Sequence, residues 1–140
     1  MLALEKELLR LEMALFQVSM SAAVFPVLSP AYRALAMKSF EMCLEHASSV
    51  MTCLLLEKGS AKASKGSEPF RMLVARARQH GIVSDGKCWR LYRDWRNESV
   101  HHYSDKAADR ILGGMAGFIR SSRGLLAGVS AGMEGGDEFM

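Results

Sequence analysis

Apolar residues near the start of the chain recur at the spacing of an α-helix. One row, spaced four and three residues apart, consists of Leu4, Leu8, Leu11, Leu15 and Val18. A second row beside it consists of Leu9, Met13, Phe16 and Met20. Because residues three and four apart lie on one side of a helix, the two rows predict a helix from about residue 2 to residue 23. Its apolar stripe is wide enough to contact both a core and a partner chain.

The same spacing predicts a second helix that ends near Lys58. Its apolar row consists of Phe40, Leu44, Ala47, Met51 and Leu54. Ser29 suits the N-cap position and Pro30 the first helical position. Gly59 ends the helix, and the polar segment KGSAKASKGSE then forms a connector.

Capping signals divide the rest of the chain into three further helices. A third helix is predicted from about residue 68 to residue 80, with Gly81 after its end. Ser84 or Asp85 can cap a fourth helix, whose apolar residues are Trp89, Leu91, Tyr92 and Trp95. Ser104 and Asp105 can cap a fifth, which contains Ile111, Leu112, Met115, Phe118 and Ile119. Gly113 and Gly117 would let another helix approach this one closely.

No segment alternates with the period of a β-strand, so the sequence predicts an all-α protein. The expected architecture is an antiparallel up-and-down bundle of four to five helices that dimerises. A length of 140 residues suits one core, and we assign residues 1–127 to a single helical domain. Residues 128–140, GVSAGMEGGDEFM, are predicted to form a flexible, acidic and Gly-rich tail.

Composition and charge exclude several classes of protein. With 49% apolar residues, the chain is too apolar for a disordered protein. The long window without charges, residues 13–32, contains three serines and two prolines and makes a poor membrane span. The acidic segment LEKELLRLE before it is unlike the start of a signal peptide. The cysteines, Cys43, Cys53 and Cys88, form no C-x-x-C pair, so we expect free thiols and a cytoplasmic location.

Basic residues are concentrated in one part of the chain. Residues 71–96 contain two acids and seven bases, namely Arg71, Arg76, Arg78, Lys87, Arg90, Arg93 and Arg96. A local basic surface suits a polyanionic partner such as RNA. The same run is also compatible with a solvated helix face.

The segment RDWRNESVHHYSDK, residues 93–106, concentrates the side chains best suited to chemistry. Arg96 and His101 are five residues apart, which on a regular helix separates them by roughly 140°. Asn97 and His101 would share a face. Arginine matches two phosphate oxygens, and histidine exchanges protons near neutral pH. The pair therefore suits RNA cleavage without a metal, in which a proton is moved and a charged phosphate is stabilised.

Plainer interpretations of these residues remain open. Arg96 can form an ion pair at the surface. His101 can form a hydrogen bond with a backbone carbonyl at the end of a helix, and Tyr103 can be a half-buried residue of the bundle. The adjacent His101 and His102 would diverge by about 100°, which argues against a shared metal ion. We therefore expect neither a metal site nor another cofactor. The aromatic residues of the fourth helix favour core or interface packing.

One arginine and one histidine per chain provide too few groups for both the acid and the base of the reaction. A two-fold homodimer would supply the missing groups by placing the motif of one chain opposite its copy. The sequence therefore leads us to expect that a monomeric variant would be inactive.

The run GIVSDGKCWRLYRDWRNESVHHYSDKAADRIL resembles the HEPN superfamily. More specifically, it is similar to the nucleotidyltransferase substrate-binding proteins and to the HepT-type toxins of toxin–antitoxin pairs. The family's pattern of a Trp followed by Arg-Asn-x3-His-x-Tyr matches Trp89, Arg96, Asn97, His101 and Tyr103. The resemblance extends over about residues 40–119.

The resemblance implies a helical homodimer and a neighbouring minimal nucleotidyltransferase, which is the antitoxin in toxin pairs. In the HepT-like branch, Arg96 and His101 would be the catalytic residues of a metal-independent ribonuclease, supported by Asn97. Tyr103 would accept AMP from the partner. The alternative is a non-catalytic substrate-binding subunit of a two-component nucleotidyltransferase. A structural dimer with an incidental motif is a third possibility.

Overall fold

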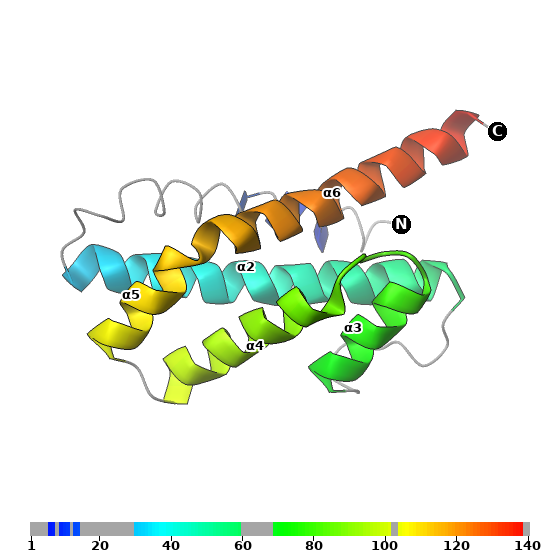
Figure 1. Cartoon of the computed structure of the whole chain (residues 1–140). Helices are drawn as coiled ribbons and strands as arrows, with labels where there is room; N and C mark the ends of the chain where they lie inside the picture. The colour runs from blue at the N-terminus through cyan, green and yellow to red at the C-terminus, as the bar shows by residue number, and fades with distance from the viewer. Residues whose placement is uncertain are drawn as a thin grey trace.

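The computed structural model describes residues 6, 7, 9–11, 13, 14, 30–59, 69–101 and 104–138. Within these ranges the chain is helical and contains no strand. The helices given in full are α2 (Pro30–Glu57), α3 (Phe70–Gln79), α4 (Gly86–His101), α5 (Asp105–Gly113) and α6 (Met115–Glu138). In Figure 1, α4 runs opposite to α2 and α6, and α3 and α5 lie at the two ends of α4. The prediction of an all-α bundle is confirmed.

The long helix α2 is the centre of the fold, because α3, α4 and α5 all pack against it. Its apolar row was predicted from the spacing, and Phe40, Leu44, Ala47 and Met51 are indeed buried. The last residue of the predicted row, Leu54, is only half-buried, and its neighbour Leu55 is buried in its place. The periodicity therefore identified the inner face of α2 to within one residue.

The ends of the helices follow the capping signals. The first residue of α2 is Pro30, and Ser29 lies outside the described residues. Gly59 and Gly81, which follow α2 and α3, have φ angles of 85° and 74°. These left-handed conformations are costly for residues with a Cβ, which explains why glycine stops each helix.

Side-chain caps begin α4 and α5. Asp85 rather than Ser84 caps α4, since the Lys87 backbone N–H donates to Asp85 Oδ1 over 2.9 Å. The Ser104 hydroxyl accepts from the Ala107 N–H over 3.0 Å at the start of α5. Each cap satisfies a backbone donor that has no partner inside the helix.

The predicted fifth helix is in fact two helices. It breaks at Gly114, which follows α5 and precedes α6 and whose N–H bonds to the carbonyls of Ile111 and Leu112. Gly114 also lies against α4, because a Cβ at this position would be 2.7 Å from Trp95 Cη2. The close approach foreseen at Gly113 and Gly117 therefore occurs at Gly114, whereas a Cβ on Gly117 would still lie 3.8 Å from the Tyr92 hydroxyl.

The two ends of the chain differ in how far the structure describes them. The backbone of α6 continues to Glu138, so helix extends across the predicted boundary at residue 127. The flexibility of that tail stays a prediction. Of the predicted first helix, the described residues within 6–14 are helical, with Leu11 buried and Leu9 and Met13 58% and 65% exposed. Leu11 of the first row therefore contacts the core, whereas Leu9 and Met13 of the second row face outward.

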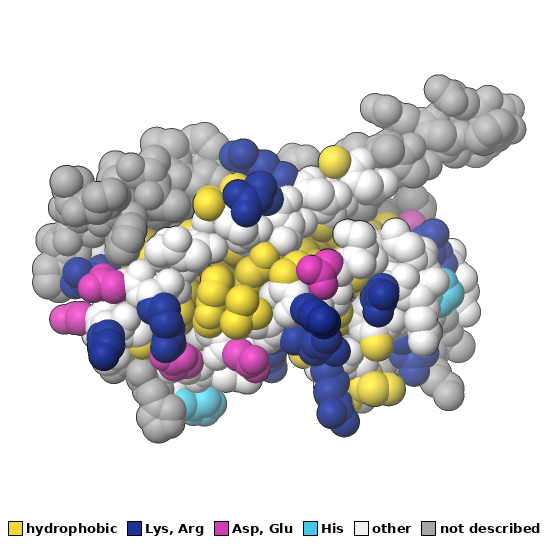
Figure 2. Space-filling model, viewed as in Figure 1, with side chains coloured by type: hydrophobic (Ala, Val, Ile, Leu, Met, Phe, Trp, Pro, Cys, Tyr) yellow, Lys and Arg dark blue, Asp and Glu magenta, His cyan; other side chains and the backbone are white. Residues whose placement is uncertain are grey.

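An aromatic cluster joins α2, α4 and α6. It consists of Phe40, Trp89, Tyr92, Trp95 and Phe118, and the ring centroids of Phe118 lie 4.8 Å from Phe40 and 5.0 Å from Tyr92. This confirms that the aromatic residues of α4 are packing residues. Figure 2 shows hydrophobic side chains reaching the surface between α4 and α6. Among the described residues, no helix is long and apolar enough to cross a membrane.

Candidate functional site

The predicted motif residues lie along the second half of α4 and do not all meet. Arg96 and Asn97 are half-buried, and Arg96 Nη1 donates to Asn97 Oδ1 over 3.4 Å. His101 is the last residue of α4 and is exposed. Asn97, expected beside the His101 ring, therefore contacts the arginine. Tyr103 lies outside the described residues, as does His102.

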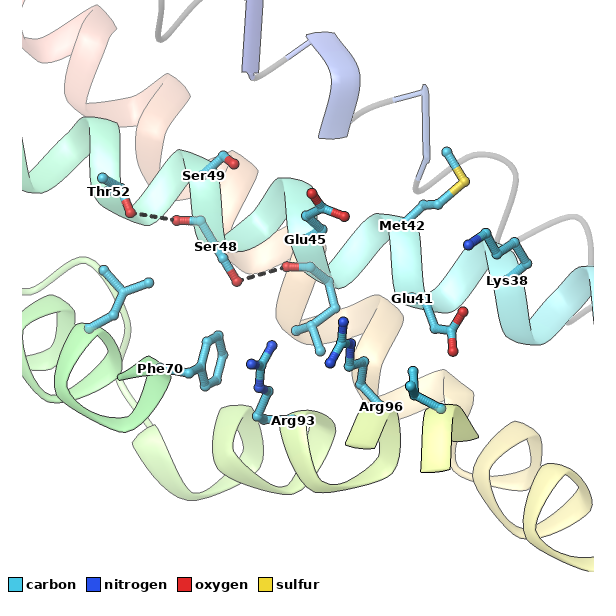
Figure 3. Close-up of a pocket in the computed structure, with 13 residues that line it drawn as sticks. Lys38, Glu41, Met42, Glu45, Ser48, Ser49, Thr52, Phe70, Arg93 and Arg96 are labelled. Carbon is cyan, nitrogen blue, oxygen red and sulfur yellow. Dashed lines mark hydrogen bonds between the residues drawn. The ribbon is translucent and has the colours of Figure 1, made fainter. Parts of the chain in front are cut away.

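An open cavity of about 420 Å³ lies between α2, α3 and α4 (Figure 3). Its volume falls within the range of small-molecule sites in proteins. Arg96 lines it, whereas His101 does not. The lining residues are Lys38, Glu41, Met42, Leu44, Glu45, Ser48, Ser49, Thr52, Phe70, Leu73, Arg93, Arg96 and Val100.

Arg93 is the site residue that reasoning from the sequence missed. It was counted in the basic run, but it lines the cavity together with Arg96, three residues further along α4. Figure 3 shows both guanidinium groups extending from α4 toward α2. The signal was present in the spacing, since residues three apart share a helix face.

The position of Arg93 is fixed by an aromatic ring. Its guanidinium carbon lies 5.5 Å from the centre of the Phe70 ring, at the first turn of α3, in the range of a cation–π contact. Burial lowers the pKa of Arg93, and the neighbouring charge of Arg96 lowers it further. Both burial and the repulsion between the two half-buried guanidinium groups disfavour the cationic form of Arg93.

The wall formed by α2 is acidic and hydroxylic. Glu41 Oε1 accepts a hydrogen bond of 2.6 Å from the buried Ser99 hydroxyl of α4. The Ser48 hydroxyl donates to the Leu44 carbonyl over 3.0 Å, which leaves its oxygen able to accept. In Figure 3 the Glu41 carboxylate lies on the side of α2 that faces α4. The cavity thus places Arg93 and Arg96 of α4 opposite the acceptors Glu41 and Ser48 of α2, a wall that also carries Lys38.

The structure separates the basic run into two groups. Arg93 and Arg96 line the cavity. The other five take no part in its lining: Arg76 is half-buried, and Arg71, Arg78, Lys87 and Arg90 are exposed. The solvated-face interpretation therefore fits the exposed residues, and only the end of the run contributes to the site.

The three cysteines form no disulfide, as predicted, with Cys43 buried and Cys53 and Cys88 half-buried. Burial raises the pKa of Cys43 to about 12, although the neighbouring Ser122 side chain acts in the opposite direction. A thiol so seldom ionised is a poor nucleophile. In the part of the chain that the structure describes, no cluster of acidic, histidine and cysteine side chains could hold a metal ion.

Two comparisons with known proteins identify the class to which this helical bundle belongs. The family described as "nucleotidyltransferase substrate binding protein like" matches residues 3–131. The solved structure of HI0074 from Haemophilus influenzae is similar, with a TM-score of 0.69 and 24% sequence identity. The similarity covers 91% of this chain and 96% of HI0074, which is described as the substrate binding domain of a nucleotidyltransferase. No protein with a curated description matches the sequence.

Because the family pattern covers nearly the whole sequence, the chain belongs to the nucleotidyltransferase substrate-binding protein family. This confirms the family suggested by the segment around Arg96. At 24% identity, the likeness to HI0074 supports the fold alone.

Proposed function

We propose that this protein is the substrate-binding subunit of a two-component nucleotidyltransferase. The observation that carries the proposal is the cavity between α2 and α4, where Arg93 and Arg96 lie opposite Glu41 and Ser48. In such a cavity, convergent polar and charged groups can fix the orientation of a ligand. A separate minimal nucleotidyltransferase supplies the nucleotide and the metal, and this chain presents the acceptor.

The test combines the purified protein with the transferase encoded beside it, magnesium, ATP and a small-molecule extract of the host cell. We expect the two proteins to co-elute in size-exclusion chromatography and pyrophosphate release to depend on this chain. Arg96→Gln should lower that release, because it removes a cation from the cavity. Arg90→Gln is the matched control, since Arg90 is exposed on the same helix and outside the cavity. Equal release with and without this chain would refute the proposal.

A second candidate function is that of a HepT-like toxin with metal-independent ribonuclease activity. The observation that favours it is the exposure of His101 at the end of α4, on the helix that sends Arg96 into an open cavity. An exposed imidazole is available to an RNA strand or to a second subunit. In this mechanism His101 moves the proton, Arg96 stabilises the phosphate and Asn97 holds Arg96.

The ribonuclease is tested with structured RNA in EDTA. Cleavage by the wild type should be lost in Arg96→Ala and in His101→Ala. His80→Ala is the matched control, because His80 is an exposed histidine just after the end of α3. If His101→Ala cleaves as fast as the wild type, this candidate is excluded.

The ribonuclease would act as a homodimer in which the two motifs face each other. Leu9 and Met13 of the first helix are largely exposed and offer an apolar surface. Light scattering would give the mass in solution. A Leu9→Lys, Met13→Lys variant should be monomeric and inactive on RNA, and an active monomer would contradict the shared site.

In this second candidate function, the partner transferase would control the ribonuclease by modifying it. AMP transferred to Tyr103 would add a bulky anion two residues beyond His101 and so oppose the binding of RNA. Intact mass spectrometry after incubation with the transferase, ATP and magnesium should show an added AMP. Unchanged addition in Tyr103→Phe would exclude this residue as the acceptor.

A further inference from the structure

The Glu41 carboxylate of α2 is held in one orientation by a residue of α4. Its Oε1 accepts the hydrogen bond of 2.6 Å from the Ser99 hydroxyl. Ser99 is buried, and its hydroxyl also lies 2.9 Å from the Arg96 carbonyl oxygen. Because the serine cannot turn away without losing both contacts, the carboxylate keeps its place. A group that is positioned before the ligand arrives needs little reorganisation during a reaction.

The second carboxylate oxygen of Glu41, Oε2, is open to a ligand. Ser99 uses only Oε1. Within the described residues, no lysine, arginine or histidine lies within ion-pair distance of this carboxylate. A carboxylate oxygen accepts hydrogen bonds and can take a proton. Since the carboxylate lies on the side of α2 that faces α4 (Figure 3), Oε2 is available to a hydroxyl group held in the cavity.

Few other side chains of the cavity wall can take a proton from a hydroxyl. The lining arginines, lysine, serines and threonine are not bases near neutral pH, and His101 does not line the cavity. The second lining carboxylate, Glu45, is exposed, and it is bonded to no other residue that the structure describes. A general base acts from a fixed position within hydrogen-bond reach of the proton that it moves. Glu41 meets this requirement better than Glu45.

The place of Glu41 along the cavity suits a reaction with a second protein. Met42 follows Glu41 in the chain, and Val100 follows Ser99. Both line the cavity, and they are 42% and 50% exposed. The Glu41–Ser99 hydrogen bond therefore lies close to the mouth of the cavity. A nucleotide that is brought by a separate transferase must approach the acceptor through this mouth.

We propose that Glu41 is the general base of the transfer reaction and that Ser99 is the residue that positions it. Oε2 of Glu41 takes the proton of an acceptor hydroxyl while the hydroxyl oxygen forms a bond to the α-phosphorus of ATP. The bond from this phosphorus to the oxygen that bridges the α- and β-phosphates breaks, and pyrophosphate leaves with the electron pair. The proposal rests on the proposed function, because it assigns a step of the reaction in which this chain presents the acceptor.

The variant Glu41→Gln tests the catalytic role. The assay is pyrophosphate release by the transferase with this chain, magnesium, ATP and a dilution series of the host-cell extract. Glutamine keeps the size of the side chain and an oxygen for Ser99, but it does not take a proton. We expect the rate at saturating extract to fall by about 100-fold or more, while the half-saturating dilution changes by less than about threefold. An unchanged rate, or a loss confined to the half-saturating dilution, would overturn the assignment.

The matched control is Glu57→Gln, which makes the same change at the exposed last residue of α2, outside the cavity. Its rate should stay within about twofold of the wild type, because a surface substitution of this kind disturbs little. Circular dichroism of each variant verifies the fold. Should Glu41→Gln fail to fold, the variants of Ser99 decide the question.

Ser99→Ala and Ser99→Thr test the positioning role. Ser99→Ala leaves the carboxylate without its partner, so the rate at saturating extract should fall by about tenfold or more. Ser99→Thr keeps the hydroxyl and should recover most of the rate. A wild-type rate in Ser99→Ala would show that Glu41 needs no positioning. Equal losses in the two variants would mean that packing matters and the hydroxyl does not, which also contradicts the proposal.

The outcomes separate this inference from the proposed function. If pyrophosphate release requires this chain but Glu41→Gln works at the wild-type rate, the subunit function stands and the assignment of the base is wrong. If release is the same with and without this chain, the proposed function fails, and the role of Glu41 fails with it.

Discussion

Trp95 of α4 and Gly114, between α5 and α6, lie so close together that position 114 has no room for a side chain. A Cβ there would be 2.7 Å from Trp95 Cη2 and 3.2 Å from Cζ2. The indole cannot easily move away, because its ring centroid is 5.5 Å from that of Tyr92 and 6.3 Å from that of Phe40. This contact sets the point at which the chain leaves α5 and turns into α6, and it steadies the helix that carries Arg93 and Arg96.

Gly114→Ala should therefore destabilise the protein. We expect a loss of about 1–3 kcal/mol in the free energy of unfolding, typical of an overpacked contact. Gly113→Ala is the matched control, because a Cβ at that position would meet nothing within 4 Å and α5 would gain helix propensity. Urea titrations of both variants measure the difference. Equal stability of the two would mean that the indole moves without cost.

A hydrogen bond between Tyr92 and Ser121 links α4 to α6. Their hydroxyl oxygens are 2.8 Å apart in a partly buried setting. A double-mutant cycle with Tyr92→Phe, Ser121→Ala and the pair should give a coupling energy of about 0.5–1.5 kcal/mol. Urea denaturation provides all four values. Strictly additive losses would show that the two hydroxyls contribute independently.

Stability should decline at alkaline pH because of Cys43. Its pKa is 9.0 without the fold and about 12 when buried, so the folded state holds the proton more tightly. The stabilisation is therefore complete below pH 9 and is lost as pH rises from there toward 12. Burial raises the pKa of Tyr92 as well, in the same direction.

The loss attributable to Cys43 amounts to about 1.4 kcal/mol per pH unit between these limits. Cys43→Ala should consequently lose about 1 kcal/mol less than the wild type between about pH 8 and pH 10. Comparing each protein with itself at the two pH values removes the cost of the smaller side chain. Parallel declines of the two proteins would contradict a role for this thiol.

The ion pair between Arg33 and Asp109 should stabilise the contact of α2 with α5 only slightly. Arg33 Nε lies 2.8 Å from Asp109 Oδ1, but the aspartate side chain is 50% exposed. Asp109→Asn should cost about 0.2–1 kcal/mol at low salt. In about 1 M NaCl the difference from the wild type should shrink, because salt screens exposed charges. A loss that salt leaves unchanged would point to packing rather than charge.

Local signals were sufficient for most of the secondary structure. Pro30, Gly59 and Gly81 marked helix ends through backbone geometry that depends on one or two residues. The break at Gly114 was missed, and so was the contact of this position with Trp95, a residue of a different helix. A glycine within an apolar helical pattern carries no sign of which side chain will fill the space beside it.

The candidate site shows the same division. The motif drew attention to Arg96, Asn97 and His101 by residue type and spacing, and α4 does carry all three. Arg96 lines the cavity while His101 is exposed, and this difference depends on how α4 packs on α2 and α3. The spacing alone put Arg93 on the same helix face as Arg96, whereas its contact with Phe70 of α3 depends on the packing of the helices.

By itself, the sequence determined that this protein is a bundle of helices, where most of them begin and end, and to which family it belongs. These properties follow from hydrophobic period, capping residues and short motifs, all of which act within a few residues. Tertiary structure alone decided which basic side chains share a cavity and which acceptors face them. Those relationships join residues from α2, α3 and α4, and such contacts exist only after the helices have packed.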